Sequence, residues 1–185
     1  MSGAGSFFVR WRVRLGYPLA LVVLWFARPT IRSILLAVPV GGLGLLVRGL
    51  SAGHLHKQKV LTVTGPYAYT RNPLYLGSAF LTLAAAIAMH SWISAVILWV
   101  YFAVFYFAVM RREEAELRKL HGADFDRYAA SVPLFFPRWR HAETTASEGS
   151  RFSLAQYRKN HEHQAAVGFL LLLAMLFLIH WLRAR

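Results

Sequence analysis

The sequence contains no cysteine, which excludes disulfide bonds, thiolate metal sites and cysteine nucleophiles. Acidic residues are also scarce, because 8 Asp and Glu stand against 21 Lys and Arg and leave a formal net charge of +13. Hydrophobic residues make up 57% of the 185 positions, so too few polar side chains remain to coat a soluble domain of this size. A membrane protein is therefore the first expectation.

The apolar residues fall in blocks that approach the length of a membrane span. A helix rises about 1.5 Å per residue and needs roughly 20 residues to cross the hydrocarbon core. The sequence predicts five such helices, the first of them short, over residues 15–27, 31–50, 74–90, 92–110 and 165–182. The predicted fold class is all-α: a polytopic membrane bundle of about five transmembrane helices with a cytoplasmic helical catalytic segment.

The distribution of Lys and Arg predicts the orientation. Residues 111–159 hold more basic residues than any other connection, so this segment should face the cytoplasm together with the loop that carries Lys57, Lys59 and Arg71. We expect an integral membrane protein whose active site faces the cytoplasm, in the inner membrane of a bacterium or the endoplasmic reticulum of a eukaryote. Because the basic residues flank membrane segments, they indicate membrane lipids as partners and not nucleic acid.

Two polar stretches between the helices should carry the function. The predicted organisation is a membrane core over residues 1–141, a polar linker over 142–164 and a C-terminal transmembrane helix over 165–185, with the cofactor elements at 60–77 and 111–137. Residues 111–121 should continue the preceding helix outside the bilayer, because each mid-bilayer charge costs about 2.5–3.5 kcal/mol. Gly122 is the expected end of that helix. The glycines within residues 41–44 lie in an apolar run and indicate close helix packing.

The first motif is GPYAYTRNPLYLG, over residues 65–77. Its Asn72-Pro73 pair places a proline where a helix should begin, and Gly77 leaves one face of that helix open to a close neighbour. Taken alone, the motif is equally consistent with a loop that enters a membrane helix, with its tyrosines as interfacial anchors.

The second motif is RREEAELRKLHGADFDRYAASVPLFFP, over residues 111–137. It places two adjacent carboxylates directly after a membrane helix, at the rim of a region of low dielectric constant. On a solvated helix face, Glu114 would simply pair with Arg118 four residues later. Adjacent helical residues point about 100° apart, however, so one glutamate can pair with an arginine while the other faces a ligand.

Together the two motifs resemble the isoprenylcysteine carboxyl methyltransferase and phospholipid methyltransferase superfamily of integral membrane enzymes. Members carry a GPY…RHPxYxG stretch, a membrane hairpin, and then a double glutamate with a downstream Gly, aromatic residues and Val-Pro. The matching residues here are Gly65, Pro66, Tyr67, Arg71, Pro73, Tyr75, Gly77, Glu113, Glu114, Leu117, Gly122, Phe125, Tyr128, Val132, Pro133 and Pro137. Asn72 replaces the family histidine, and asparagine can hydrogen-bond a cofactor but cannot take up a proton near neutral pH.

The resemblance implies an S-adenosylmethionine-dependent methyltransferase whose acceptor is lipophilic, either an isoprenylcysteine-like carboxylate or a lipid amine. The expected catalytic residues are Glu114, as the base for an amine acceptor, and Arg111. The expected cofactor-binding residues are Tyr67, Arg71, Asn72, Pro73, Tyr75, Gly77, Glu113 and Glu114. The aromatic rings would favour the cationic methyl donor, the carboxylates would accept from its hydroxyl or amino groups, and Arg71 or Arg111 would hold a carboxylate.

Two other functions remain open at this point. A membrane sterol-type reductase that uses NADPH shares a similar C-terminal ending, and a non-enzymatic scaffold or transporter would also be helical. The histidine pairs at His54 with His56 and at His161 with His163 have metal-ligand spacing, but they lie in basic juxtamembrane segments, so we expect no metal. Association into a homo-oligomer stays open.

Overall fold

The computed structural model describes residues 3–55, 60–139 and 151–185, with side chains from residue 14 onward. Within these ranges the chain is all-α, as predicted, and has no strand. The elements are α1 (Gly3–Phe26), α2 (Ile31–His54), the 3₁₀ turn η1 (Gly65–Ala68), α3 (Pro73–Met89), α4 (Trp92–His121), α5 (Ala123–Ser131), α6 (Leu154–Lys159) and α7 (His163–Arg183).

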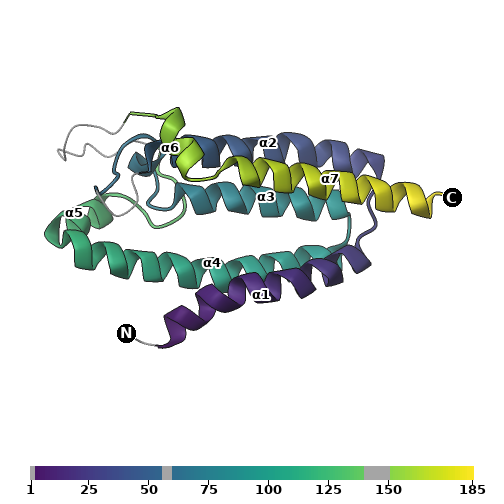
Figure 1. Cartoon of the computed structure of the whole chain (residues 1–185), viewed down its shortest axis with the longest axis horizontal. Helices are drawn as coiled ribbons and strands as arrows, with labels where there is room; N and C mark the ends of the chain where they lie inside the picture. Colours follow the sequence, from purple (N-terminus) through teal and green to yellow (C-terminus); the bar gives the residue numbers. More distant parts are fainter. Residues whose placement is uncertain (1–2, 56–59, 140–150) are drawn as a thin grey trace.

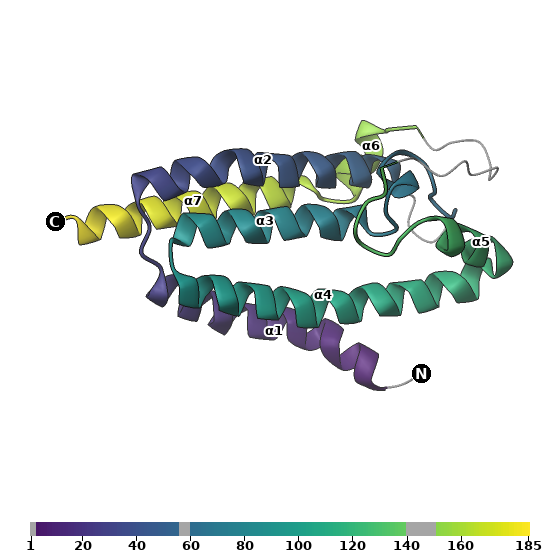
Figure 2. The same ribbon diagram turned by 180° about the vertical axis from the view of Figure 1, so that it is seen from behind.

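The helices form an elongated bundle with two groups. Helices α2, α3 and α7 run side by side, and α4 runs alongside α1 beneath them (Figure 1). The view from behind shows the same grouping, with η1, α5 and α6 gathered at one end of the bundle (Figure 2). Helix α1 begins near that end, whereas α7 ends at the opposite one. The two predicted cofactor elements therefore meet at a single end of the bundle.

Three described helices, α2, α4 and α7, are long and apolar enough to cross a membrane. This identifies a membrane protein. The other two predicted spans are shorter, because α3 has 17 residues and the predicted apolar run of the first span covers only residues 15–27, although α1 itself begins at Gly3. Seventeen residues rise only about 25 Å against a hydrocarbon core of about 30 Å. Five transmembrane helices therefore remain a prediction.

Capping residues fix where the membrane helices begin and end. Thr30 caps α2 reciprocally with Ser33, since each backbone N–H donates to the other side chain at 3.0 Å. Helix α3 begins at Pro73, as predicted, and α4 runs on to His121 before ending at Gly122, whose φ of 51° suits glycine. The predicted extension of α4 beyond the apolar run is thus confirmed.

Two glycines bring α2 and α3 into backbone contact. A Cβ on Gly44 would lie 2.8 Å from the carbonyl oxygen of Gly77, and a Cβ on Gly77 would lie 2.7 Å from that of Gly44. Gly41 faces the ring of Phe169 in α7, where a Cβ would lie 2.0 Å from the nearest ring carbon. These contacts confirm the predicted packing role for Gly41 and Gly44 but not for Gly42, where a Cβ would meet no atom within 4 Å. The contact of Gly44 with Gly77 fixes α3 and its N-terminal loop relative to α2.

Two helices were not predicted from the sequence. Helix α5 follows α4 directly, and α6 lies within residues 151–164 of the predicted linker. Residues 142–150 of that linker, together with Lys57, Lys59 and His56, lie outside the described residues. The division of the chain into a core, a linker and a C-terminal helix stays a prediction.

Replacing Gly44 by alanine should destabilise the protein, because the new methyl group cannot fit against α3 without separating the helices. Overpacking of this kind costs about 1–3 kcal/mol, which outweighs the gain of about 1 kcal/mol that alanine brings to a helix. Gly42→Ala is the matched control on the same helix, since a Cβ there meets no atom within 4 Å. Thermal unfolding in detergent should show a lower midpoint for Gly44→Ala only, and equal midpoints would contradict the close contact.

Candidate functional site

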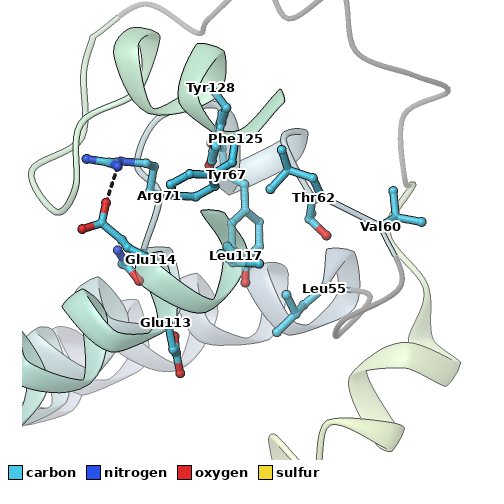
Figure 3. A pocket seen from close by; sticks show the side chains of 12 residues that line it. Leu55, Val60, Thr62, Tyr67, Arg71, Glu113, Glu114, Leu117, Phe125 and Tyr128 are labelled. Atoms are coloured by element: carbon cyan, nitrogen blue, oxygen red, sulfur yellow. Dashed lines mark hydrogen bonds and ion pairs between the residues drawn. The ribbon is translucent and has the colours of Figure 1, made fainter. Parts of the chain in front are cut away.

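A small pocket of about 60 Å³ lies at the end of the bundle where η1, α4 and α5 meet (Figure 3). Twelve residues line it: Leu55, Val60, Leu61, Thr62, Tyr67, Arg71, Asn72, Glu113, Glu114, Leu117, Phe125 and Tyr128. All of them except Leu55 come from the two predicted cofactor elements, which the α3–α4 hairpin connects in sequence. Nine different residues were predicted for the site. Five of them line the pocket: Tyr67, Arg71, Asn72, Glu113 and Glu114.

A buried ion pair joins the two elements. Glu114 is only 7% exposed, and its carboxylate accepts from Arg71 Nη1 on one oxygen and from Arg111 Nη1, at 2.9 Å, on the other. Arg71 is also largely buried, whereas Arg111 is mostly exposed. The solvated pairing of Glu114 with Arg118 does not form, because Arg118 pairs with Asp126 at 2.7 Å. Glu114 therefore ties the loop before α3 to the end of α4.

The neighbouring carboxylate, Glu113, points to a different side of α4 (Figure 3). Its Oε1 accepts a hydrogen bond of 2.6 Å from the hydroxyl of Tyr75, near the start of α3. The Tyr75 ring packs edge-on against Tyr106, with 5.5 Å between centroids. The two adjacent glutamates thus contact different partners, as the 100° rotation between helical neighbours indicates.

Tyr67 forms the aromatic wall of the pocket. It is 7% exposed, and its backbone carbonyl accepts a hydrogen bond of 2.7 Å from the hydroxyl of Tyr128 in α5. Burial is the main cause that raises the pKa of the Tyr67 phenol far above its usual range, and the neighbouring Tyr128 and Glu113 raise it further. Burial likewise raises the pKa of Tyr128, partly offset by the charge of Arg71. Both phenols therefore stay neutral and can donate hydrogen bonds at physiological pH.

The segment after α5 holds the loop in place. The Arg71 backbone N–H donates to the carbonyl oxygen of Pro133 at 2.9 Å, and the Asn72 side-chain Nδ2 donates to that of Leu134 at 3.0 Å. The Thr70 hydroxyl donates to the carbonyl oxygen of Phe135 at 2.9 Å. Asn72 thus lines the pocket while its amide group secures the loop, a contact that needs no proton transfer.

The other predicted site residues lie around the pocket and not in its wall. Pro73 starts α3, and Gly77 contacts α2. Tyr75 reaches the site through Glu113, and Arg111 reaches it through Glu114. Tyr75 and Arg111 thus contact lining side chains, whereas Pro73 and Gly77 position α3.

A second ion pair near the pocket was not predicted. Arg48 of α2 donates through Nε and Nη2 to both carboxylate oxygens of Glu162, at 2.9 and 2.8 Å, and through Nη1 to the Ser78 hydroxyl of α3. Glu162 directly precedes α7, so the pair fixes that helix to the core. Arg48 lies inside the apolar run of residues 31–50, where a charge needs a partner, so the sequence did contain a signal for an ion pair at this position.

Helix α6 is fastened to the end of α2 beside the pocket. The side-chain amides of Gln156 and Asn160 donate to the carbonyl oxygen of Leu55 at 2.6 and 3.2 Å, and Asn160 also donates to that of Ala52 at 2.8 Å. Leu55 is itself a lining residue. These bonds satisfy carbonyl groups that the helix end leaves without partners.

Within the described ranges, no group of three or more His, Cys, Asp or Glu side chains lies close enough together to hold a metal ion.

Comparison with known proteins confirms the resemblance drawn from the two motifs. Residues 45–124 match the model of the phospholipid methyltransferase family, which belongs to the superfamily of integral membrane methyltransferases. The matched segment includes the loop before α3, the α3–α4 hairpin and the double glutamate.

Two curated relatives carry names that refer to metal resistance. The nickel-cobalt-cadmium resistance protein NccN of Alcaligenes xylosoxydans xylosoxydans is 41% identical over 83 residues, which cover 44% of this chain and 38% of the relative. The cobalt-zinc-cadmium resistance protein CzcN of Cupriavidus metallidurans is 30% identical over 135 residues, which cover 69% and 62%. The chain thus spans less than two thirds of either relative, and no solved structure gives a significant match.

Replacing Glu114 by glutamine should destabilise the protein, because it leaves the buried Arg71 without its negative partner. Breaking a buried pair costs about 3–5 kcal/mol, whereas an exposed pair is worth about 0–1 kcal/mol. Glu116→Gln is the control, since its pair with Arg112 is exposed on the same helix. The thermal midpoint in detergent should fall by at least about 6 °C for Glu114→Gln. Equal midpoints for the two variants would show that the Arg71 pair is not formed.

Proposed function

We propose, from the match of residues 45–124 to the phospholipid methyltransferase family, that this chain transfers a methyl group from S-adenosylmethionine to a lipophilic acceptor in the bilayer. The acceptor is an isoprenylcysteine-like carboxylate or a lipid amine. The proposal rests on one observation: Glu114 forms ion pairs with both Arg71 and Arg111, and these contacts join the two motifs around one pocket. The family match favours methyl transfer over reduction with NADPH.

The side chains of the pocket suit the charges of S-adenosylmethionine. Among the described residues, Arg71 Nε is buried and has no hydrogen-bond partner, and an unsatisfied buried donor costs about 1–3 kcal/mol. The carboxylate of the methionine moiety is an acceptor that would satisfy it. The Tyr67 ring offers an aromatic face to a sulfonium cation, and Glu113 offers a carboxylate to the amino group or a ribose hydroxyl.

The volume of the pocket sets a condition on binding. About 60 Å³ is far below the roughly 300–1,000 Å³ of sites that bind ligands of this size. Binding therefore requires the walls to separate. The ion pair would keep Arg71 and Glu114 together during this change, because separating two largely buried charges costs more than moving the apolar side chains of Leu55 or Leu117.

The bound cofactor would supply an electrophilic methyl group on a cationic sulfur. The protein's own residues would contribute position and the exclusion of water, which are the main requirements of a displacement at a methyl carbon. Arg71 binds the anionic group, with its guanidinium oriented by Glu114. Leu61, Leu117 and Phe125 keep water away from the reacting atoms.

The hydrogen bonds change the role that we propose for Glu114. Both of its oxygens already accept from guanidinium groups, so it acts as a positioning residue for Arg71 and Arg111. Glu113 is then the carboxylate that receives the proton of an amine acceptor, since it points toward the start of α3. A carboxylate acceptor needs no base. We further propose that the site faces the cytoplasm, because residues 111–159 hold more Lys and Arg than any other connection between the helices.

Glu113→Gln should weaken S-adenosylmethionine binding at least tenfold, equivalent to about 1.4 kcal/mol, because the cofactor loses a charged acceptor. The matched control is Glu116→Gln, another exposed glutamate on the outer part of α4. Titration calorimetry on the detergent-purified chain measures the affinity, with NADPH as the competing candidate. NADPH binding without an S-adenosylmethionine signal would instead favour a reductase, and equal weakening by both variants would remove Glu113 from the site.

A further inference from the structure

A second cavity, of about 260 Å³, lies among the membrane helices away from the pocket already described. Its walls come from α1, α3 and α4, with one residue from α7. Helices α1 and α7 lie outside the segment that matches the methyltransferase family. Six of its thirteen lining residues therefore come from parts of this chain that the family match does not include.

The lining of the cavity suits hydrocarbon. Small and aliphatic side chains dominate it, among them Ala20 and Val23 of α1 and Ala85 and Met89 of α3. An apolar cavity of about 150 Å³ binds benzene, whereas whole drug-sized ligands need roughly 300–1,000 Å³. The volume of about 260 Å³ falls between these sizes. If one methylene group occupies about 30 Å³, the volume of one molecule in liquid water, the cavity holds roughly eight methylene groups. The cavity thus fits a segment of one hydrocarbon chain.

Aromatic side chains connect this cavity to the polar pocket. Tyr106 lines the cavity, stacks on Phe102 with 4.5 Å between ring centroids, and packs edge-on against Tyr75 at 5.5 Å. The Tyr75 hydroxyl donates to Glu113, which lines the polar pocket. A molecule whose apolar chain lies in the cavity and passes Tyr106 would therefore place its polar end near Tyr75 and Glu113.

We propose that this cavity binds the hydrocarbon chain of the methyl acceptor, so that the acceptor is an amphiphile that inserts one chain between α1, α3 and α4. That the bound molecule is a methyl acceptor rests on the proposed function. That it carries a hydrocarbon chain rests on the size and apolar lining of the cavity. Dispersion contacts and burial of about 0.8 kcal/mol per methylene would hold the chain, and Tyr75 with Glu113 would face the polar end.

Gly16 offers a direct way to fill the cavity. It lines the α1 wall, and a Cβ there lies in ordinary contact with the Tyr101 hydroxyl oxygen at 3.4 Å, so a leucine side chain would occupy the chain-binding space. Gly168→Leu is the matched control, because Gly168 is exposed on α7 and a Cβ there meets no atom within 4 Å. Ala20→Leu, at an exposed position that also lines the cavity, is a second filling variant for the case that Gly16→Leu does not fold.

The experiment uses dodecylamine with a diazirine in its chain, irradiated with the full chain in phosphatidylcholine nanodiscs and mapped by peptide mass spectrometry. We expect adducts on lining residues such as Val23 and Phe102, reduced at least fivefold by Gly16→Leu or Ala20→Leu and unchanged by Gly168→Leu. Adducts spread over exposed residues such as Leu21 and Leu36, or adducts indifferent to the filling variants, would overturn the proposal.

A second readout separates this inference from the proposed function. With S-adenosylmethionine added before irradiation, the adduct should gain the mass of one methylene, because a methyl group replaces a proton on the amine. Cavity adducts without this gain would leave the chain-binding site standing and would count against transfer to an amine. A methylated probe whose adducts lie outside the cavity would overturn the chain-binding site alone.

Discussion

The contact between Arg71 and Glu114 determines how the polar end of this protein is arranged. The two side chains are 43 positions apart in sequence and belong to different motifs, yet both are largely buried and share a pocket of about 60 Å³. Neither charge is stable there alone, because an unpaired buried ion costs several kcal/mol. The loop before α3 and the outer part of α4 must therefore meet. The contact between these two segments also sets the positions of the Tyr67 ring and the Glu113 carboxylate.

The membrane helices supply the frame on which this contact depends. Gly44 and Gly77 allow α2 and α3 to touch along their backbones, which fixes the loop that carries Arg71. The Arg48–Glu162 pair fastens α7 to the same frame, although α7 lies outside the segment that matches the methyltransferase family. Small residues at helix contacts and paired charges near the span ends are the usual means of packing helices in a bilayer, where the hydrophobic effect does not distinguish helix from lipid. Helix α7 is thus part of the bundle.

Much of this arrangement could be predicted from the sequence. Apolar blocks and capping residues located α2, α3, α4 and α7 to within a few residues, including the start of α3 at Pro73 and the end of α4 at Gly122. Helix α1 begins twelve residues before the predicted 15–27. The different directions of Glu113 and Glu114 followed from helical geometry. Local spacing could not show that Glu114 pairs with Arg71 and not Arg118, because that choice depends on how distant segments pack. Helix α5 was missed for the same reason: it is short, and its stability comes from burying Phe125 and Tyr128 against the loop.

The central claim is that the pocket around Arg71 and Glu114 supports methyl transfer to a molecule dissolved in the bilayer. The most direct test is to incubate membranes that contain the chain with S-adenosylmethionine carrying a tritiated methyl group and to count the label in the organic extract. The account predicts label in an extractable amphiphile. This label should be lost when Arg71 is replaced by alanine and kept when Arg112 is replaced by alanine, because the Arg112 pair with Glu116 is exposed whereas the Arg71 pair with Glu114 is largely buried. Label that appears equally in membranes without the chain, or that survives the loss of Arg71, would contradict it.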